Sequence, residues 1–566
     1  NRPGMGTMRP FALYDKTKSV KALTAVLYDA RGNVIRKFKK RDFNDVSATG
    51  SDLYTDSRAL VLDFTPTHFP FTFEIEREVH SSNTAFLPRW DPMPMYDVST
   101  EFSSFEIVNP KQLPLVKRTF NFEEYGVSVS KTPSALVYKV ESLAALDSEP
   151  MSPHYTEFKP FMKVALQEFR LKSKAAKVRD WREFGLWQQN SLLNDRNKLP
   201  NQTLSQVSTL VSGIDDPKDK ARAIYNFMQD RTRYISVQIG IGGWQPMLAS
   251  EVDKLNYGDC KALTNYTMAL LESQGIESYY TIVSAGEDGR DLDEEFVALQ
   301  GNHVILSVPF EDEMVFLECT NQQVPFNYIG THTDDRKVLM VTPEGGVMTK
   351  THTYSPDDNG RVLKGTAVFD ERLTLTGIVE EESSGIRYGD KYPLESVNRD
   401  EITRFYAEHW FHLNDLKVSN VVFENDKRAI VFKERLNYQT DGYVSKAGNR
   451  ILLNPNIFNR QYDIPEHRKD RLLPLEIRRG YTDIDEIEIS LPEGYEVTSL
   501  FEPVVLENEY GQYEVSITPI EGRKLRYRRY LKINSGRYPK EKFAAFVEFS
   551  KEIVKKDKSK IVLSKT

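Results

Sequence analysis

Tyr257-Gly258-Asp259-Cys260-Lys261-Ala262-Leu263 contains one of only two cysteines in a chain of 566 residues. Asp259 is a favourable N-cap, so the sequence predicts that a loop ends and a helix begins here. A helix start presents unpaired N–H groups and the positive end of the helix dipole, and both stabilise a thiolate. The stretch therefore predicts a helix that starts at Cys260 and a reactive thiol there.

Two strand-like segments downstream carry an imidazole and a carboxylate, His303 and Glu318. If they form a hairpin with Glu311-Asp312 as a two-residue loop, Ile305 opposes Glu318 and His303 lies diagonally from it on the same face. Cys319 then points to the opposite face, which predicts a buried and inert thiol. Cys260, His303 and Glu318 are thus candidates for a nucleophile, a base and the group that orients the base.

These residue types also have simpler roles in proteins. A lone cysteine near a helix start is often a small buried residue, and a strand histidine is often part of the core or the surface. His332, in a polar loop after the hairpin, is the alternative imidazole. A disulfide between Cys260 and Cys319 would consume the proposed nucleophile.

Acyl chemistry also needs hydrogen-bond donors for an oxyanion. The Cys260 backbone N–H is one candidate, with Asp259 supporting the helix start. Trp244 and Gln245 are side-chain candidates, with Gln238 as a third. The glycines between Ile239 and Gln245 do not predict a phosphate-binding loop, because no Lys-Ser/Thr pair follows them.

Nothing in the sequence predicts a metal or another cofactor. His409 and His412 are spaced as half of a metal site, but no third ligand accompanies them, so a solvated face is the better interpretation. A twelve-residue calcium loop ending in glutamate is also missing from the sequence.

The length predicts three domains. Residues 1–157 are expected to form an antiparallel β-sandwich, because short alternating runs are separated by turns such as Asp29–Asn33. Residues 158–347 are expected to hold a helical lead-in and the core with Cys260. Residues 348–566 are expected to form a β-rich domain that ends in a helix around Phe543–Val554. The predicted fold class is α+β.

In the middle region, the sequence predicts where individual helices lie and where they start or end. Phe161, Val164, Ala165 and Phe169, at three- and four-residue spacings, predict a helix in the lead-in. Asp216-Pro217 predicts a helix that ends near Arg233. Gly275 followed by Ile276 predicts the end of the Cys260 helix, and a strand is expected over residues 279–284.

Charge and hydropathy exclude several function classes. The net charge of −7 is spread along the chain, so no nucleic-acid partner is expected. The basic run Arg523–Arg529 alternates with Leu and Tyr and predicts a strand with a solvated face. Mean hydropathy is −0.50, and no run approaches the roughly 20 apolar residues of a membrane span.

Several segments resemble the transglutaminase-like cysteine superfamily over about residues 200–345. They are Asp219–Phe227, Arg233-Tyr234-Ile235, Tyr257–Lys261, Asn302-His303-Val304 and Leu317-Glu318. The segment Ile239–Pro246 and the flanking β regions are similar to a bacterial subset in which this core lies between two β-rich domains of unknown function.

The resemblance implies a papain-like core, with Cys260 as nucleophile, His303 as base and Glu318 as third member. The family usually has aspartate in an Asp-Pro-Thr sequence, whereas Glu318-Cys319-Thr320 stands here. The extra methylene requires the ring or the strand to adjust. The bacterial subset resembles exported proteins, which implies a periplasmic or secreted location.

The leading hypothesis is a cysteine peptidase or amidohydrolase that cleaves a peptide or protein-like polymer through an acyl-enzyme. One alternative is a transglutaminase, which passes the acyl group to an amine. A second is a binding or scaffold protein whose β domains dock a partner around an inactive core. The sequence leaves the oligomeric state open.

Overall fold

The computed structural model describes residues 10–49, 53–66, 68–287, 289–466 and 468–566. It separates into two compact units, residues 1–147 with 155–351 and residues 148–154 with 352–566. Both units contain helices and strands, which agrees with the expected α+β class. The first two expected domains fall almost wholly within the first unit, and the third within the second. The expected boundary at 347/348 lies inside strand β22 (Gly345–Lys350).

The N-terminal region consists of small sheets. One contains β3 (Val34–Lys39), β2 (Lys18–Tyr28) and β7 (Thr72–Ser81), and another β1 (Phe11–Tyr14), β6 (Arg58–Val61) and β4 (Asn44–Ser47). Leu23, Phe38 and Leu60 belong to one buried cluster. A third sheet contains β10 (Ser128–Lys131), β11 (Ala135–Leu143) and β8 (Thr100–Val108). The predicted turn at Asp29–Asn33 is confirmed, because the Asp29 N–H donates to the Asn33 carbonyl.

The predicted helix over Phe161–Phe169 is wrong. These residues form strands β12 (Phe161–Leu166), β13 (Glu168–Leu171) and, after a turn, β14 (Lys174–Lys177), and β12 pairs with β9 (Leu115–Phe120). Both faces of β12 are largely buried, so its apolar residues do not alternate and their spacing imitates that of a helix. The first α-helix of the described residues begins later, with α1 (Trp181–Gln188).

A five-stranded antiparallel sheet forms the centre of the first unit. Its order is β20 (Met314–Leu317), β19 (His303–Pro309), β18 (Tyr279–Val283), β21 (Lys337–Thr342) and β22. The predicted hairpin register is confirmed, because Leu306 pairs with Leu317 and Pro309 with Met314. This register brings Ile305 opposite Glu318, which immediately follows β20.

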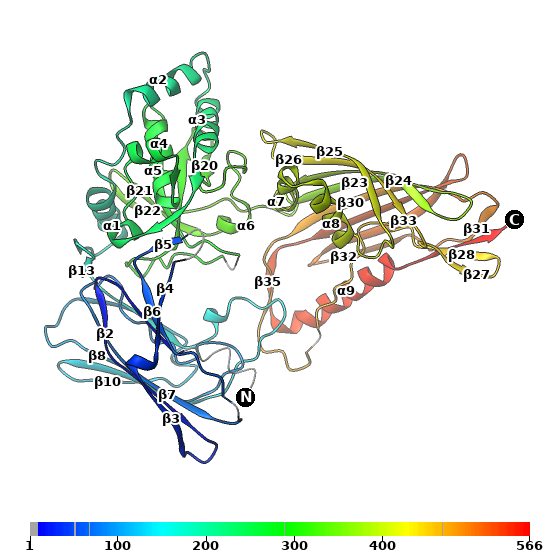
Figure 1. Cartoon of the computed structure of the whole chain (residues 1–566). Helices are drawn as coiled ribbons and strands as arrows, with labels where there is room; N and C mark the ends of the chain where they lie inside the picture. Colours follow the sequence, from blue (N-terminus) through cyan, green and yellow to red (C-terminus); the bar gives the residue numbers. More distant parts are fainter. Residues whose placement is uncertain (1–9, 50–52, 67, 288, 467) are drawn as a thin grey trace. The chain divides into compact units, whose positions relative to one another are not determined.

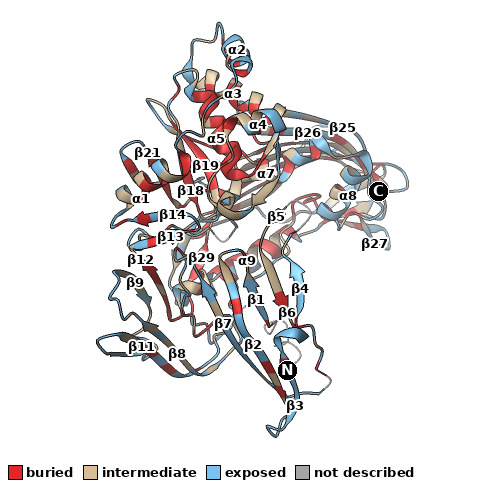
Figure 2. Ribbon diagram, turned by 60° about the vertical axis from the view of Figure 1, so that its left-hand side comes forward, coloured by how far each residue is buried: buried red, intermediate tan, exposed pale blue. Residues whose placement is uncertain are grey.

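Helix α5 (Cys260–Glu272) packs on β19 and β18 of this sheet. Helices α3 (Pro217–Arg231) and α4 (Ala249–Leu255) lie against α5, and α2 (Asn201–Leu210) packs on α3 (Figure 1). Eleven of the thirteen α5 residues are buried, as the red colouring in Figure 2 shows. The predicted end of α5 is confirmed, since Gly275 has φ 71° and the Ile276 N–H donates to the Leu271 carbonyl at 3.1 Å. A helix this deeply buried holds Cys260 in a fixed position.

Helix α1 approaches β22 more closely than side chains would allow. A Cβ on Gly185 would lie 1.9 Å from the backbone nitrogen of Gly346, and a Cβ on Gly346 would lie 2.2 Å from the Trp181 carbonyl oxygen. Only glycine permits this contact between a helix and a strand. The contact fixes the position of α1 on the sheet, and with it Gln188 at the last position of the helix.

The second unit is built on an eight-stranded sheet in which only β23 and β30 are parallel. In order, its strands are β25 (Lys417–Asp426), β26 (Val431–Thr440), β24 (Leu375–Ser384), β23 (Gly360–Phe369), β30 (Tyr481–Ser490), β34 (Lys524–Ile533), β33 (Gly511–Ile520) and β32 (Val504–Asn508). Helices α7 (Ile386–Lys391) and α8 (Arg399–His409) contact the sheet, and helix α9 (Phe543–Asp557) shares its buried apolar cluster.

The chain does not end in a helix, which corrects that expectation. After α9 it forms strand β36 (Ile561–Lys565), which lies between β28 (Arg450–Leu453) and β31 (Tyr495–Ser499). Ile561 and Leu563 are fully buried, while Val562 and Ser564 are less so. The strand is too short to have a clear period in the sequence, and its apolar residues are explained only by the partner strands.

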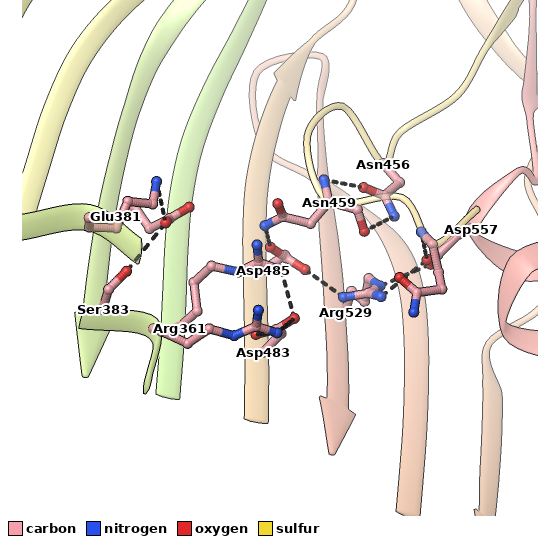
Figure 3. Close-up of polar contacts among 12 residues, drawn as sticks. Arg361, Glu381, Ser383, Asn456, Asn459, Asp483, Asp485, Arg529 and Asp557 are labelled. Carbon is pink, nitrogen blue, oxygen red and sulfur yellow. Dashed lines mark hydrogen bonds and ion pairs between the residues drawn. The ribbon is translucent and has the colours of Figure 1, made fainter. Parts of the chain in front are cut away.

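A layer of buried charges crosses the sheet of the second unit (Figure 3). The Arg529 guanidinium donates to Asp485 at 3.0 Å and to Asp557 at 2.9 Å, and Arg361 donates to Asp483 at 2.6 Å. The Tyr513 hydroxyl also donates to Asp557, at 2.8 Å. Because Asp557 is the last residue of α9, this layer ties the helix to β34 and β30.

No helix of the described residues is long and apolar enough to span a bilayer.

Candidate active site

Cys260 is the first residue of α5, as the sequence predicts. The Asp259 side chain accepts a hydrogen bond from the Ala262 N–H at 2.9 Å, which is the expected N-cap. Asp259 also forms a buried ion pair with Lys261. As the first residue of a helix, Cys260 has a backbone N–H with no acceptor inside the helix, so this N–H is free to bind another group.

His303 and Glu318 contact each other across the hairpin. His303 begins β19, Glu318 directly follows β20, and the His303 Nε2 lies 2.8 Å from the Glu318 Oε2. The other carboxylate oxygen accepts the Thr320 N–H at 3.0 Å and the Thr320 hydroxyl at 2.5 Å. Thr320 therefore fixes the longer glutamate side chain in the orientation that reaches the ring.

The charges of this pair favour an imidazolium ion. Burial lowers the pKa of His303, but the Glu318 carboxylate and hydrogen bonds to Cys260 and Glu318 outweigh it and raise the pKa to about 10. Burial alone would raise the pKa of Glu318. The charge of His303 and the hydrogen bonds from Thr320 outweigh burial, so the pKa of Glu318 lies below its usual range. With Nε2 engaged by Glu318, the second ring nitrogen is left for the Cys260 thiol.

The remaining cysteine and the alternative histidine occupy different surroundings. Cys319 is fully buried, and burial raises the pKa of its thiol to about 12, in agreement with an inert residue. Both cysteines are free thiols. The His332 ring lies beside the His303 ring, with centroids 5.7 Å apart. His303 is the histidine that contacts Glu318, and its interaction with Cys260 helps to raise its pKa.

Cys260 and His303 open into a cleft of about 240 Å³. Its lining combines aromatic and aliphatic side chains with carboxamides. They are Phe86, Trp244, Tyr280, Ile282, Leu299 and Val304, and Gln188, Gln238, Gln300 and Asn302. Lys261 also lines the cleft, but its charge is balanced by Asp259.

The three side chains expected to serve as oxyanion donors lie in different positions. Trp244 and Gln238 line the cleft, and Gln238 makes a long hydrogen bond of 3.4 Å to the Ser236 hydroxyl. Gln245 is not among the lining residues. Its amide nitrogen faces the backbone carbonyls of Ser191 and Leu192, at 3.5 and 3.3 Å, so it serves the chain segment after α1.

Gln188 is a cleft residue that the sequence motifs do not reveal. Its side chain lines the cleft, only 6% of the residue is exposed, and its carboxamide has no hydrogen-bond partner among the described residues. By contrast, the carboxamides of Gln300 and Asn302 bond to nearby backbone groups. The sequence does contain one indication of this role. Gln188 continues the buried side of α1 that contains Phe184 and Gly185, and a polar residue is unusual on such a side.

Two family models match the chain, one before and one after the site residues in sequence. Residues 8–144 match the model of a domain of unknown function with solved structure (DUF3857), and residues 449–563 match a second such model (DUF3858). The two matches lie on either side of the residues that contain Cys260, His303 and Glu318. No curated protein matches the chain in sequence.

A crystal structure of a "putative protease" from Parabacteroides distasonis is similar over 100% of this chain and 93% of its own. The TM-score is 0.61 and the sequence identity 12%. At this identity the similarity shows a shared fold. A "putative cysteine protease" from Cytophaga hutchinsonii aligns with 55% of this chain and 80% of its own, at 9% identity. Its TM-score of 0.18 is too low to indicate a shared fold.

The histidines weighed as a partial metal site have other contacts. The His409 ring is stacked on Phe405, and the His412 Nε2 lies 2.7 Å from the Ile457 carbonyl. Burial lowers the pKa of each to about 4. Within the described ranges, no group of three or more His, Cys, Asp or Glu side chains could hold a metal ion.

Proposed function

We propose that the protein is a cysteine peptidase or amidohydrolase that cleaves amide bonds in peptides or protein-like polymers through an acyl-enzyme on Cys260. The observation that carries this proposal is the buried His303–Glu318 pair beside a thiol at a helix start. A thiolate and an imidazolium held together in a cleft are the reactants that nucleophilic acyl chemistry requires.

The proposed reaction has two steps. The Cys260 thiolate attacks the amide carbonyl carbon, and the tetrahedral oxyanion is bound by the Cys260 N–H and a cleft carboxamide. The imidazolium of His303 protonates the leaving nitrogen as the C–N bond breaks, which leaves a thioester. Water then attacks the thioester while His303 accepts its proton, and a carboxylic acid and the free thiol are released. Glu318 orients the ring in both steps.

For the oxyanion carboxamide, Gln188 is our choice over Gln238. Gln188 lines the cleft and has no protein hydrogen-bond partner among the described residues, so no hydrogen bond within the protein must break before it binds a substrate. Gln238 must first give up its contact with Ser236.

The test is turnover of a mixed peptide library, analysed by mass spectrometry with and without a small primary amine. We expect new carboxyl termini in the wild-type chain and none in Cys260→Ala. Cys319→Ala is the matched control and should cleave like wild type. Transfer to the amine without hydrolysis would indicate a transglutaminase instead. No product, together with slow alkylation of Cys260 that is indifferent to His303→Ala, would overturn the proposal in favour of a binding protein.

A further inference from the structure

Phe86 reaches the cleft from a part of the chain far from Cys260 in sequence. It lies between β7 and β8, within residues 8–144 that match a domain of unknown function. Its ring centroid is 5.6 Å from that of Trp244, at an interplanar angle of 35°, and 48% of the residue is exposed. One side of an aromatic pair is therefore open at the cleft.

The backbone just before Phe86 is fixed to strand β13. The N–H groups of Thr84 and Ala85 both donate to the Arg170 carbonyl, at 2.9 and 3.2 Å. The Arg170 N–H in turn donates to the Thr84 hydroxyl at 2.8 Å. These three hydrogen bonds hold Phe86 in position at the cleft, so its partial exposure does not arise from a loosely attached loop.

Trp244 also lies beside a charged pair. The Lys172 ammonium is 5.7 Å from the Trp244 ring centroid, within the range of a cation–π contact. Lys172 pairs with Asp15 of the N-terminal region at 2.6 Å, and its side chain is only 8% exposed. Trp244 thus contacts Phe86 and Lys172, and both contacts depend on the N-terminal region.

The loop that carries Trp244 is also tied to this region through its backbone. Strand β5 (Leu53–Thr55) pairs in parallel with β16 (Ser236–Gln238), which directly precedes the loop. The Asp56 carboxylate then accepts the Gly240 N–H at 3.3 Å. The N-terminal region therefore supplies one aromatic side chain of the cleft and positions a second.

The chemistry of this wall selects an uncharged group. Phe86 and Trp244 present ring faces, and Ile282 and Leu299 add aliphatic surface to the same cleft. The Lys261 charge is already balanced by Asp259, so the lining residues that the structure describes present no unpaired charge away from His303. Aromatic rings of this kind gain most from burying an apolar or aromatic side chain.

We propose that the N-terminal β region is part of the substrate site, and that Phe86 with Trp244 binds an apolar side chain of the polypeptide whose carbonyl faces Cys260. The proposal rests on the role given to Cys260 above. It assigns the region of unknown function a task in substrate selection. Phe86 is a specificity residue, and Asp15, Asp56 and Lys172 are positioning residues.

The test compares two alkylating probes of Cys260 that differ by one ring, iodoacetamide and N-benzyl iodoacetamide. In the wild-type chain we expect the benzyl probe to react about 3- to 10-fold faster, since its ring packs on Phe86 and Trp244. Phe86→Ala should abolish this preference, measured as the ratio of the two rates, and Phe86→Leu should keep part of it. Circular dichroism of each variant checks that the chain is folded.

Phe102→Ala is the matched control, because Phe102 is also in the N-terminal region and 54% exposed but does not line the cleft. It should retain the wild-type preference. Equal rates for both probes in the wild type, or an unchanged preference in Phe86→Ala, would overturn the proposal.

The same variants separate this proposal from the proposed hydrolysis. A benzyl preference that depends on Phe86, in a chain that cleaves no peptide, would support the subsite and overturn the hydrolase. Peptide cleavage with the same side-chain selectivity in wild type and Phe86→Ala would support the hydrolase and overturn the subsite.

Discussion

Glu318 is the residue whose negative charge keeps His303 protonated. Burial alone would lower the pKa of this imidazole below its ordinary value of 6.5, and the charge of Glu318 is the first influence that opposes it. Because the folded pKa is about 10, the imidazolium stabilises the fold fully below about pH 6.5, and this contribution is lost as the pH rises through about 10.

We therefore expect Glu318→Gln to lower the pKa of His303. The alkaline limb of Cys260 alkylation, which is the change in rate where His303 loses its proton, should move to lower pH. The measurement is the pH profile of iodoacetamide labelling between pH 5 and 11. Thr320→Val is the control, because it keeps the carboxylate charge and should shift the limb less. An identical alkaline limb in wild type and Glu318→Gln would contradict the role of the carboxylate.

Gln188 is the second residue whose function is testable alone. If its carboxamide binds the oxyanion, Gln188→Leu should lower kcat by about 10²- to 10³-fold, since one such donor contributes that much in other enzymes. KM should change little, because the charge develops only in the transition state. Gln238→Leu is the matched variant in the same cleft and should have the smaller effect on kcat. The reverse order of the two effects would transfer the role to Gln238.

Helix α5 has Cys260 and a buried ion pair at its start. Asp259 caps the helix and balances Lys261, whose side chain is 6% exposed. Asp216 caps α3 in the same way but is exposed, and the lysine at the equivalent position, Lys218, is partly exposed and pairs with Glu313 instead. The two helices therefore form a natural comparison of a cap with and without a buried charge.

Asp216→Ala should cost about 1 kcal/mol of unfolding free energy, the usual value of an N-cap. Asp259→Ala should cost more, by about 3 to 5 kcal/mol, because Lys261 is left buried without a partner. Asp259→Asn keeps a cap oxygen and should fall between them. Urea unfolding, with hydrogen exchange of peptides from each helix, measures the three costs. Equal costs for the two alanine variants would show that the Lys261 pair contributes nothing.

At the scale of the molecule, buried charges of the second unit connect its sheet to α9, beside an apolar cluster that the two share. Arg529 is 3% exposed and lies on the same face of β34 as Leu525 and Tyr527, whereas the neighbouring Arg528 faces solvent. The Arg523–Arg529 segment is a strand, as predicted, but the expectation of a solvated basic face holds for Arg528 and is wrong for Arg529.

Arg529→Met should therefore destabilise the second unit by about 3 to 5 kcal/mol, because Asp485 and Asp557 lose their cation inside the fold. Arg528→Met, which removes an exposed pair with Glu486, should cost about 1 kcal/mol or less. Hydrogen exchange should report the loss in peptides from α9 and β34. The native rate of Cys260 labelling should not change, since Cys260 belongs to the other unit. Similar stability of the two variants would contradict this account.

Local sequence determined the start of α5, the cap at Asp216, the end of α5 at Gly275 and the register of the β19–β20 hairpin. Each depends on a few adjacent residues, because capping, turn formation and strand parity are short-range effects. The same effects predicted that Cys319 is inert and that His303 and Glu318 share one face.

Tertiary structure decided the features that depend on contacts between distant segments. The Phe161–Leu166 run is a strand because it pairs with β9, and Ile561–Lys565 is a strand because β28 and β31 flank it. Gln188 lies in the cleft because α1 fits against glycines of β22, and Phe86 lies there because the residues before it bond to β13. No local pattern encodes such pairings, since they arise only when the whole chain buries its apolar surface at once.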